Sequence, residues 1–258
     1  MHNLKLTLCL LTALLLSGHL TQAQQTATKP AAQKTEEQKN KEYEAWTKMR
    51  DDWANLGRYR EDNQNLKAPL PGENRVVFMG NSITEGWVKL SPEFFAGKPY
   101  IGRGIGGQTT PQMLIRFRPD VIMLQPKAVV ILAGTNDIAG NTGPSSLEMI
   151  EDNLASMAEL AKSNGIKVIL SSVLPVYDYP WKPGLQPAEK IITLNKWIKA
   201  YAEANHMIYL DYFSAMVDDR KGMKAAYSED GVHPNKAGYK VMEGLAEKAI
   251  KKALQPVK

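Results

Sequence analysis

The sequence predicts an α/β protein, a three-layer α/β/α sandwich in which helices cover both faces of a parallel β-sheet. Short apolar runs rich in β-branched residues alternate with longer segments of helical periodicity, and this alternation is typical of that class. The runs that predict strands span residues 75–79, 128–133, 167–171 and 207–210. The segments that predict helices span residues 110–124, 145–164, 187–204 and 235–254. Runs that are apolar along their whole length indicate parallel strands buried on both faces.

Length and composition bound the number of domains and the kind of partner. The chain has 258 residues, of which 43% are hydrophobic, and this is enough for one substantial core. We therefore expect a single domain over residues 42–258. The formal net charge is only +5, and the basic residues are dispersed among acidic ones except for a small surplus near the C-terminus. Nothing in this pattern favours binding to nucleic acid.

The first 23 residues have the composition of a secretory signal peptide. A positive charge at Lys5 precedes an apolar run over residues 6–16, and the small-residue motif TQA follows at residues 21–23. The run is shorter than the about 20 apolar residues that a membrane span needs, and an uncleaved anchor is the alternative. We expect cleavage after residue 23, no membrane span afterwards, and export to the periplasm or the extracellular space. Cys9, the only cysteine, would leave with this segment.

Two patterns precede the predicted sheet. Residues 24–41 are rich in Gln, Thr, Ala, Lys and Glu and contain almost no large apolar residue, so we expect a flexible spacer. Apolar residues then recur at intervals of three and four, which predicts a helix with one aromatic face. These residues are Tyr43, Trp46, Met49 and Trp53. We expect this face to pack on the domain, with a ligand-binding aromatic stripe as the alternative.

Polar and glycine residues follow three of the expected strands. Ser82 follows the first strand, and Asn136 follows the strand at 128–133. Gly106 and Gly107 follow a further strand that we expect near residues 100–101. Ligands bind at the carboxyl ends of strands in sheets of this kind. These positions are therefore expected to lie on one rim of the sheet.

Ser82, Asp230 and His233 could supply a nucleophile, an orienting carboxylate and a base. A serine hydroxyl attacks effectively when an imidazole takes its proton, and the imidazole works best when a carboxylate fixes its tautomer. Asp230 and His233 are close enough in sequence to meet within one turn. His206 is the other candidate base, since the remaining two histidines lie in the predicted signal peptide, but no such neighbours surround it.

Each of these positions also has a purely structural explanation. Ser82 could belong to a helix cap, Asn136 to a helix-start turn, and Asp230 to a surface turn. The two glycines could form a phosphate loop, but neither a GxGxxG motif nor a Walker lysine follows them. These explanations do not account for the presence of nucleophile, base, carboxylate and donors in one chain, so we favour catalysis.

Four ordered blocks of the sequence resemble those of the SGNH, or GDSL-type, hydrolases. The blocks are GNSIT at 80–84, GIGGQT at 104–109, GTND at 134–137 and DGVHP at 230–234. The resemblance is closest to the branch that includes platelet-activating-factor acetylhydrolase subunits and bacterial carbohydrate esterases. It implies a flavodoxin-like parallel sheet and hydrolysis of O-acyl esters. Asn81 departs from the pattern, because the family has an aspartate before the serine. The asparagine keeps the size and hydrogen-bonding capacity of that residue and loses its charge.

The resemblance also implies roles for individual residues. Ser82 would be the nucleophile, and Asp230 and His233 would complete the catalytic triad. The backbone N–H groups of Ser82 and Gly107 and the side-chain amide of Asn136 would form the oxyanion hole. Several donors that converge on one oxygen are what a tetrahedral intermediate requires.

Other classes of protein fit the sequence less well. No cysteine remains after the predicted signal peptide, and the two remaining histidines lack the HExxH spacing or another clustered ligand pattern. We therefore expect no metal and no cofactor. The GxSxG motif of the α/β-hydrolases is absent as well. A carbohydrate-binding module without catalytic activity is disfavoured by the intact set of Ser82, Asp230 and His233.

One irregular stretch bears on the substrate. Residues 173–187 contain three aromatic residues among four prolines, and they follow a strand whose carboxyl end should face the site. Tyr177, Tyr179 and Trp181 could form an aromatic wall against a sugar ring, or they could only pack the loop. We expect the substrate to be a carbohydrate O-acetyl ester. The alternatives are a lysophospholipase or general aryl esterase, and an O-acyl transferase that uses the same triad.

Overall fold

The computed structural model describes residues 34–255. The predicted signal peptide, residues 1–23, lies outside the described residues. The chain divides into two units, residues 1–42 and residues 43–258. Within residues 34–255, no helix is both long enough and apolar enough to cross a membrane.

Helix α1 (Glu36–Asp51) begins inside the segment that was expected to be a flexible spacer. Its start is capped by Thr35, whose hydroxyl accepts the N–H of Gln38 at 3.2 Å, while the Gln38 side chain accepts the N–H of Thr35 at 2.9 Å. This reciprocal pair satisfies two N–H groups that a helix start would otherwise leave without partners. Residues 36–41 thus belong to this helix, and the cap supports its first turn.

The aromatic face predicted for this helix is not buried. Tyr43 and Trp46 are 66% and 51% exposed, and their ring centroids lie 6.2 Å apart. Most of the helix consists of charged and polar residues, so a few spaced rings do not make a continuous apolar face. The expectation that the face packs on the domain is wrong for these two side chains.

Five parallel strands form the central sheet, and the predicted α/β class is confirmed. The strands are β1 (Val76–Gly80), β2 (Tyr100–Gly104), β3 (Ala128–Leu132), β4 (Lys167–Ser171) and β5 (Ile208–Leu210). Their order in the sheet is β2-β1-β3-β4-β5, and every pairing between neighbours is parallel. Every residue of β1 and β3 is buried, which explains the uninterrupted apolar runs that the sequence shows there.

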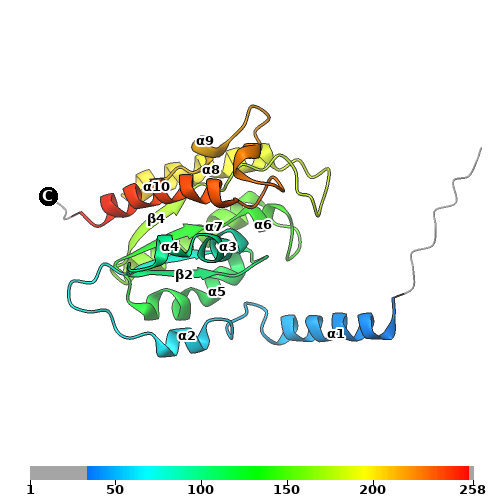
Figure 1. Cartoon of the computed structure of the whole chain (residues 1–258), viewed down its shortest axis with the longest axis horizontal. Helices are drawn as coiled ribbons and strands as arrows, with labels where there is room; N and C mark the ends of the chain where they lie inside the picture. The colour runs from blue at the N-terminus through cyan, green and yellow to red at the C-terminus, as the bar shows by residue number, and fades with distance from the viewer. Residues whose placement is uncertain (1–33, 256–258) are drawn as a thin grey trace, which may run out of the picture. The chain divides into compact units, whose positions relative to one another are not determined.

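Helices cover both faces of this sheet, and Figure 1 shows the strands between α10 and α5. The longer helices are α3 (Ser82–Leu90), α5 (Thr110–Asp120), α7 (Leu147–Ser163), α8 (Ala188–Ala204) and α10 (Lys236–Ala253). The shorter helices are α2 (Arg60–Asn65), α4 (Pro92–Phe95), α6 (Thr135–Ile138) and α9 (Phe213–Met216). Two 3-10 turns span Ile122–Leu124 and Ala225–Tyr227. The helix expected over residues 110–124 thus ends at Asp120 and is followed by a tighter turn.

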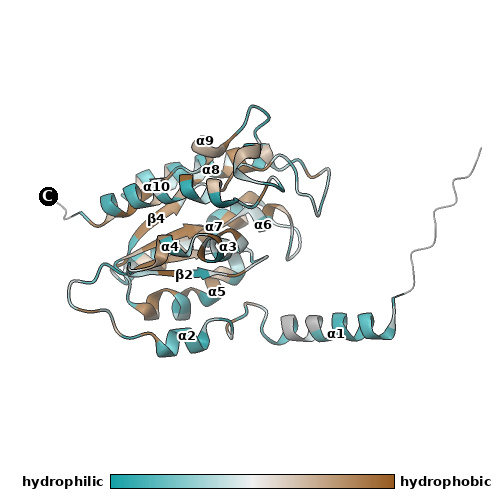
Figure 2. Ribbon diagram, in the orientation of Figure 1, coloured by the Kyte–Doolittle hydropathy of each residue, from teal (hydrophilic) through white to brown (hydrophobic). Residues whose placement is uncertain are grey.

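Alternate residues of β1 enter two apolar clusters, one on each face of the sheet. Val77 and Met79 pack with α5, α7 and α8. Val76 and Phe78 pack with α3 and α10. Because side chains alternate along a strand, one strand contributes to both cores. Figure 2 shows hydrophobic colour concentrated in the strands, while α1 and α2 are mostly hydrophilic.

The carboxyl ends of β1, β2 and β3 lie at one edge of the sheet. Gly80 pairs with Gly104 on one side and with Leu132 on the other. Helix α3 begins directly after β1 and approaches β2 closely, since a Cβ at Gly104 would lie only 2.2 Å from the backbone nitrogen of Glu85. The segments that follow the three strands therefore share one rim, where the candidate residues lie.

Candidate active site

Ser82 is the first residue of α3, and only Asn81 separates it from the end of β1. Asn81 caps this helix, since its side-chain oxygen accepts the N–H of Ile83 at 3.0 Å. The residue that departs from the family pattern thus retains a capping interaction and lacks the negative charge. The N–H of Ser82 lies in the first turn, where backbone N–H groups have no partner within the helix.

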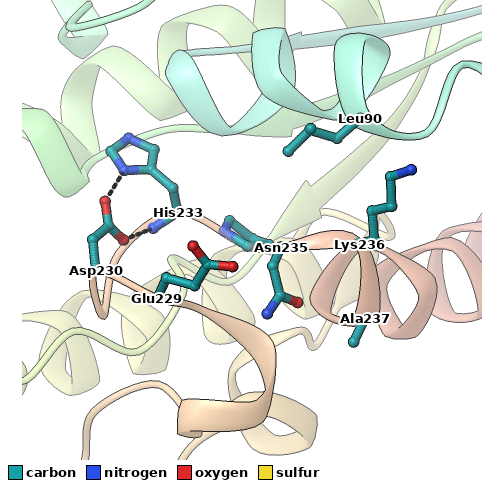
Figure 3. Close-up of a pocket in the computed structure, with 8 residues that line it drawn as sticks. Leu90, Glu229, Asp230, His233, Asn235, Lys236 and Ala237 are labelled. Carbon is teal, nitrogen blue, oxygen red and sulfur yellow. Dashed lines mark hydrogen bonds and ion pairs between the residues drawn. The ribbon is translucent and has the colours of Figure 1, made fainter.

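A chain of hydrogen bonds joins Ser82, His233 and Asp230. Ser82 Oγ lies 2.9 Å from His233 Nε2, and His233 Nδ1 lies 2.6 Å from Asp230 Oδ2. Asp230 Oδ1 accepts the N–H groups of Val232 and His233 at 2.9 and 2.8 Å. Figure 3 shows the carboxylate held against the imidazole in this way. The structure thus brings together the three residues that the sequence singled out.

The surroundings of Asp230 keep it ionised. Partial burial favours the neutral acid, but the hydrogen bonds from the His233 side chain and from the backbone N–H groups of His233 and Val232 outweigh it and lower the pKa of Asp230 to about 2. An ionised carboxylate holds a proton on Nδ1 of the imidazole and leaves Nε2 able to accept one from Ser82. His206 is exposed just before β5, at the opposite edge of the sheet.

Gly107 and Asn136 lie on the segments that follow β2 and β3. Gly107 has a φ of +75°, a left-handed conformation that favours glycine. The Asn136 amide donates to the backbone carbonyl of Gln108 at 2.9 Å, and its second N–H remains for another acceptor. A Cβ at Gly106 would lie 3.9 Å from the Cβ of Ser82. The loop of residues 105–108 therefore adjoins both Ser82 and Asn136.

Asp137 fixes the segment that carries Asn136, and the sequence analysis did not identify this role. Its buried carboxylate accepts the N–H of Thr110 at 2.9 Å and the hydroxyl of Thr110 at 2.6 Å. Burial raises the pKa of Asp137 to about 6, although these hydrogen bonds oppose the shift. The carboxylate thus ties the start of α6 to the start of α5. In the sequence, the only sign of this role is the position of Asp137 at the end of the GTND block, directly before the apolar Ile138.

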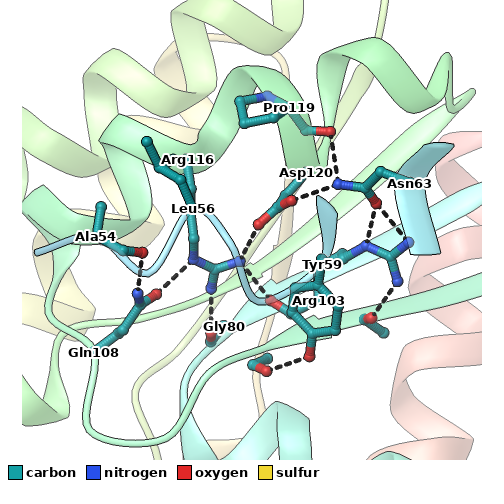
Figure 4. Close-up of polar contacts among 12 residues, drawn as sticks. Ala54, Leu56, Tyr59, Asn63, Gly80, Arg103, Gln108, Arg116, Pro119 and Asp120 are labelled. Carbon is teal, nitrogen blue, oxygen red and sulfur yellow. Dashed lines mark hydrogen bonds and ion pairs between the residues drawn. The ribbon is translucent and has the colours of Figure 1, made fainter. Parts of the chain in front are cut away.

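Arg116 carries a fully buried guanidinium that joins the loops of the site (Figure 4). It donates to the carbonyls of Gly80 and Arg103 at 2.8 and 3.0 Å, and to the side-chain oxygen of Gln108 at 2.5 Å. Asp120 lies 3.0 Å away on the next turn of α5. Burial lowers the pKa of Arg116, and the charge of Asp120 opposes this effect. The sequence analysis missed this residue, although its spacing from Asp120 was a visible signal.

Of the three aromatic residues expected to bind substrate, Trp181 lies beside the imidazole. Its ring centroid is 6.1 Å from that of His233, and the side chain is 46% exposed. Tyr179 is fully buried, and its hydroxyl donates to the carbonyl of Thr135 at 2.8 Å. Tyr177 is exposed, but it lines a hollow that does not include His233. The expected wall of three rings needs correction, because Tyr179 supports the start of α6 from within the core.

An open hollow of about 650 Å³ lies beside His233 (Figure 3). Leu90 of α3 lines one side, and residues 229–230 and 233–237 line the other. Glu229 and Lys236 supply charged groups to it, while the Asn235 amide caps α10 and donates to the carbonyl of Ala226. Such charged groups can bind the hydroxyls of a polar substrate that reaches the imidazole.

Comparison with known proteins identifies the family. Residues 78–241 match the model of the GDSL-like lipase/acylhydrolase family. The solved structure of a GDSL-like lipase from Bacteroides thetaiotaomicron VPI-5482 is 53% identical, with a TM-score of 0.76, over 78% of this chain and 99% of that chain. The chain belongs to the GDSL-like lipase/acylhydrolase family. The resemblance and the fold class inferred from the sequence are both confirmed.

Two further relatives match over part of their own length. The chain is 32% identical over 124 residues to the uncharacterized lipoprotein YqeF of Bacillus subtilis (strain 168), which covers 42% of this chain and 51% of the lipoprotein. It is 25% identical over 245 residues to an acetylxylan esterase of Xylanibacter ruminicola. This match covers 80% of this chain and 49% of that enzyme. The chain thus spans about half the length of these two relatives.

Replacement of the buried guanidinium should destabilise the fold. Arg116→Met leaves Asp120 and two backbone carbonyls without their charged partner, so the free energy of unfolding should fall by about 3–5 kcal/mol. Urea unfolding measures this change. The control is Arg118→Met on the exposed side of the same helix, for which a change within about 0.5 kcal/mol is expected. Equal effects of the two substitutions would contradict the role given to Arg116.

Proposed function

We propose that the chain is a serine esterase that hydrolyses O-acyl esters through an acyl-enzyme. The observation that carries this proposal is the hydrogen-bonded series from Ser82 through His233 to Asp230 at the carboxyl edge of the sheet. A hydroxyl, an imidazole and an ionised carboxylate in this order can activate the hydroxyl for attack on an ester. Membership of an acylhydrolase family supports the same chemistry.

The proposed reaction has two half-reactions. Ser82 Oγ attacks the carbonyl carbon of the ester while its proton passes to His233 Nε2. The N–H groups of Ser82 and Gly107 and the amide of Asn136 donate to the developing oxyanion. When the bond to the alcohol breaks, His233 returns the proton to the leaving alcohol and the acyl group stays on Ser82. Water then attacks the acyl carbon while His233 takes its proton. When the bond to Ser82 Oγ breaks, His233 passes this proton to the serine and the carboxylic acid is released.

The proposed substrate is an O-acetyl ester on a carbohydrate. Trp181 beside His233 offers an aromatic face of the kind that suits a sugar ring. The charged groups of the adjacent hollow suit hydroxyls better than they suit a long acyl chain. The similarity to an acetylxylan esterase supports the same substrate class. The proposal places the enzyme outside the cytoplasm, on the basis of the predicted signal peptide at residues 1–23.

Loss of the nucleophile or the base should abolish hydrolysis. Ser82→Ala and His233→Ala should each lower turnover of acetylated xylo-oligosaccharides and of p-nitrophenyl acetate by roughly a millionfold, because the members of a triad act as a unit. His206→Ala is the matched control and should leave turnover nearly unchanged. Equal damage from both histidine substitutions would reject His233 as the base, and activity that survives Ser82→Ala would reject the nucleophile.

The same assay separates the alternative functions. Hydrolysis that increases with the length of the acyl chain would favour a lysophospholipase or a general esterase. A new ester formed when an alcohol acceptor is added would favour an O-acyl transferase.

Asn136 should contribute mainly in the transition state. If its amide donates to the oxyanion, Asn136→Ala should lower kcat by about a hundredfold to a thousandfold with little change in KM. Thermal unfolding of the variant reports whether the amide has only a structural role. The exposed Asn164→Ala, at the opposite edge of the sheet, is the control. A normal kcat per folded molecule would remove Asn136 from the oxyanion hole.

A further inference from the structure

A second hollow, of about 330 Å³, lies next to Gly107. Asp52, Trp53 and Asn55, in the segment of residues 52–55 that precedes the sheet, form one wall, and the loop of residues 105–108 forms another. Asn141 and Thr142 line a third side. The first wall lies outside residues 78–241, the range that matches the family model. The proposed catalytic groups do not account for this hollow.

The wall formed by residues 52–55 is held firmly against the site. The side chain of Gln108 donates to the carbonyl of Ala54 at 2.7 Å, and the side chain of Gln112 donates to the carbonyl of Trp53 at 2.6 Å. The carboxylate of Asp52 accepts two backbone N–H groups of the following turn at 2.7 and 2.8 Å. These contacts fix the backbone that carries the Trp53 indole, so the wall is preformed.

The lining combines one aromatic residue with several residues that can form hydrogen bonds. Trp53 is 38% exposed, and Asn55, Asn141 and Thr142 carry amides and a hydroxyl. A sugar ring has the matching chemistry, with C–H groups on its faces and hydroxyls around its edge. The volume lies within the range of roughly 300–1,000 Å³ that is usual for small-ligand sites. This composition favours a sugar residue over a purely apolar group.

Hydrogen bonds connect the lining of the hollow to the segment that carries Trp181. The loop of residues 139–142 makes the connection: its first carbonyl accepts the ammonium of Lys182 at 2.7 Å, and the amide of Asn141 donates to the carbonyl of Gly107 at 3.1 Å. Because Lys182 follows Trp181 in the chain, the rim of the site extends from Trp181 to Gly107. A chain of sugars could follow this rim past the serine.

We propose that this hollow is a second sugar-binding subsite, in which Trp53 stacks against a sugar residue beyond the acetylated one on an oligosaccharide. The inference rests on the proposed function, because it assigns a longer carbohydrate to the same catalytic site. The competing occupant is a bulky acyl group, since the hollow adjoins the loop proposed to bind the carbonyl oxygen.

The first test compares substrates of different length. In Trp53→Ala, KM for acetylated xylo-oligosaccharides should rise about tenfold relative to KM for p-nitrophenyl acetate, because one aromatic contact is lost. Trp53→Phe should recover part of this loss. The control is Trp46→Ala, which removes an exposed indole that does not line the hollow. Unfolding curves of the variants confirm that each is folded.

Two kinetic outcomes would overturn the proposal. An equal change for oligosaccharides and p-nitrophenyl acetate would show that Trp53 supports the site only structurally. A changed preference among p-nitrophenyl esters of increasing acyl length would assign the hollow to the acyl group.

The second test measures binding without catalysis, so that failure of the subsite and failure of the proposed esterase are distinguishable. Calorimetry should show that unacetylated xylo-oligosaccharides bind Ser82→Ala about tenfold more tightly than they bind the double variant with Trp53→Ala. Activity that survives Ser82→Ala would reject the esterase mechanism but would leave this comparison valid. Equal binding by the two variants would reject the subsite.

Discussion

The buried charge of Arg116 is the constraint on which the arrangement of the site depends. An uncompensated charge in the interior costs several kcal/mol, so a buried guanidinium requires polar partners at fixed positions. Its partners are the carbonyls of Gly80 and Arg103, the side chain of Gln108, and Asp120. Movement of any of these groups would leave the charge poorly paired. The ends of β1 and β2 and the loop of residues 105–108 are therefore held together by one side chain.

Gln108 extends this constraint to the rest of the rim. Its side-chain oxygen accepts from Arg116, its side-chain nitrogen donates to Ala54, and its backbone carbonyl accepts from Asn136. The buried charge is thus coupled to the segment before the sheet and to the amide that follows β3. Stabilisation of an oxyanion depends on donors that need no reorganisation during the reaction. A rim fixed from beneath by polar contacts meets that condition, and the same contacts hold the wall proposed to bind sugar.

Structural features that produce a local pattern in the sequence could be predicted from it. Features that depend on contacts between distant segments of the folded chain could not. Strands buried on both faces produce continuous apolar runs, and a serine and a histidine in turn-like blocks stand out by residue type. Arg116 is an ordinary charged residue until the fold surrounds it, and the hydroxyl of Tyr179 meets Thr135 only in the core. Periodicity located α1 but could not predict its exposure, because spacing shows where side chains point and not what they meet.

Covalent labelling tests the central claim, that Ser82 is the nucleophile which carries the acyl group. An alkyl fluorophosphonate reacts with a serine only when a base activates it. The account predicts one adduct per molecule, located on Ser82 by peptide mass spectrometry, with loss of esterase activity in proportion to labelling. It also predicts that His233→Ala is labelled far more slowly than the unaltered protein. An adduct on another residue, or esterase activity that persists after Ser82 is fully labelled, would contradict the account.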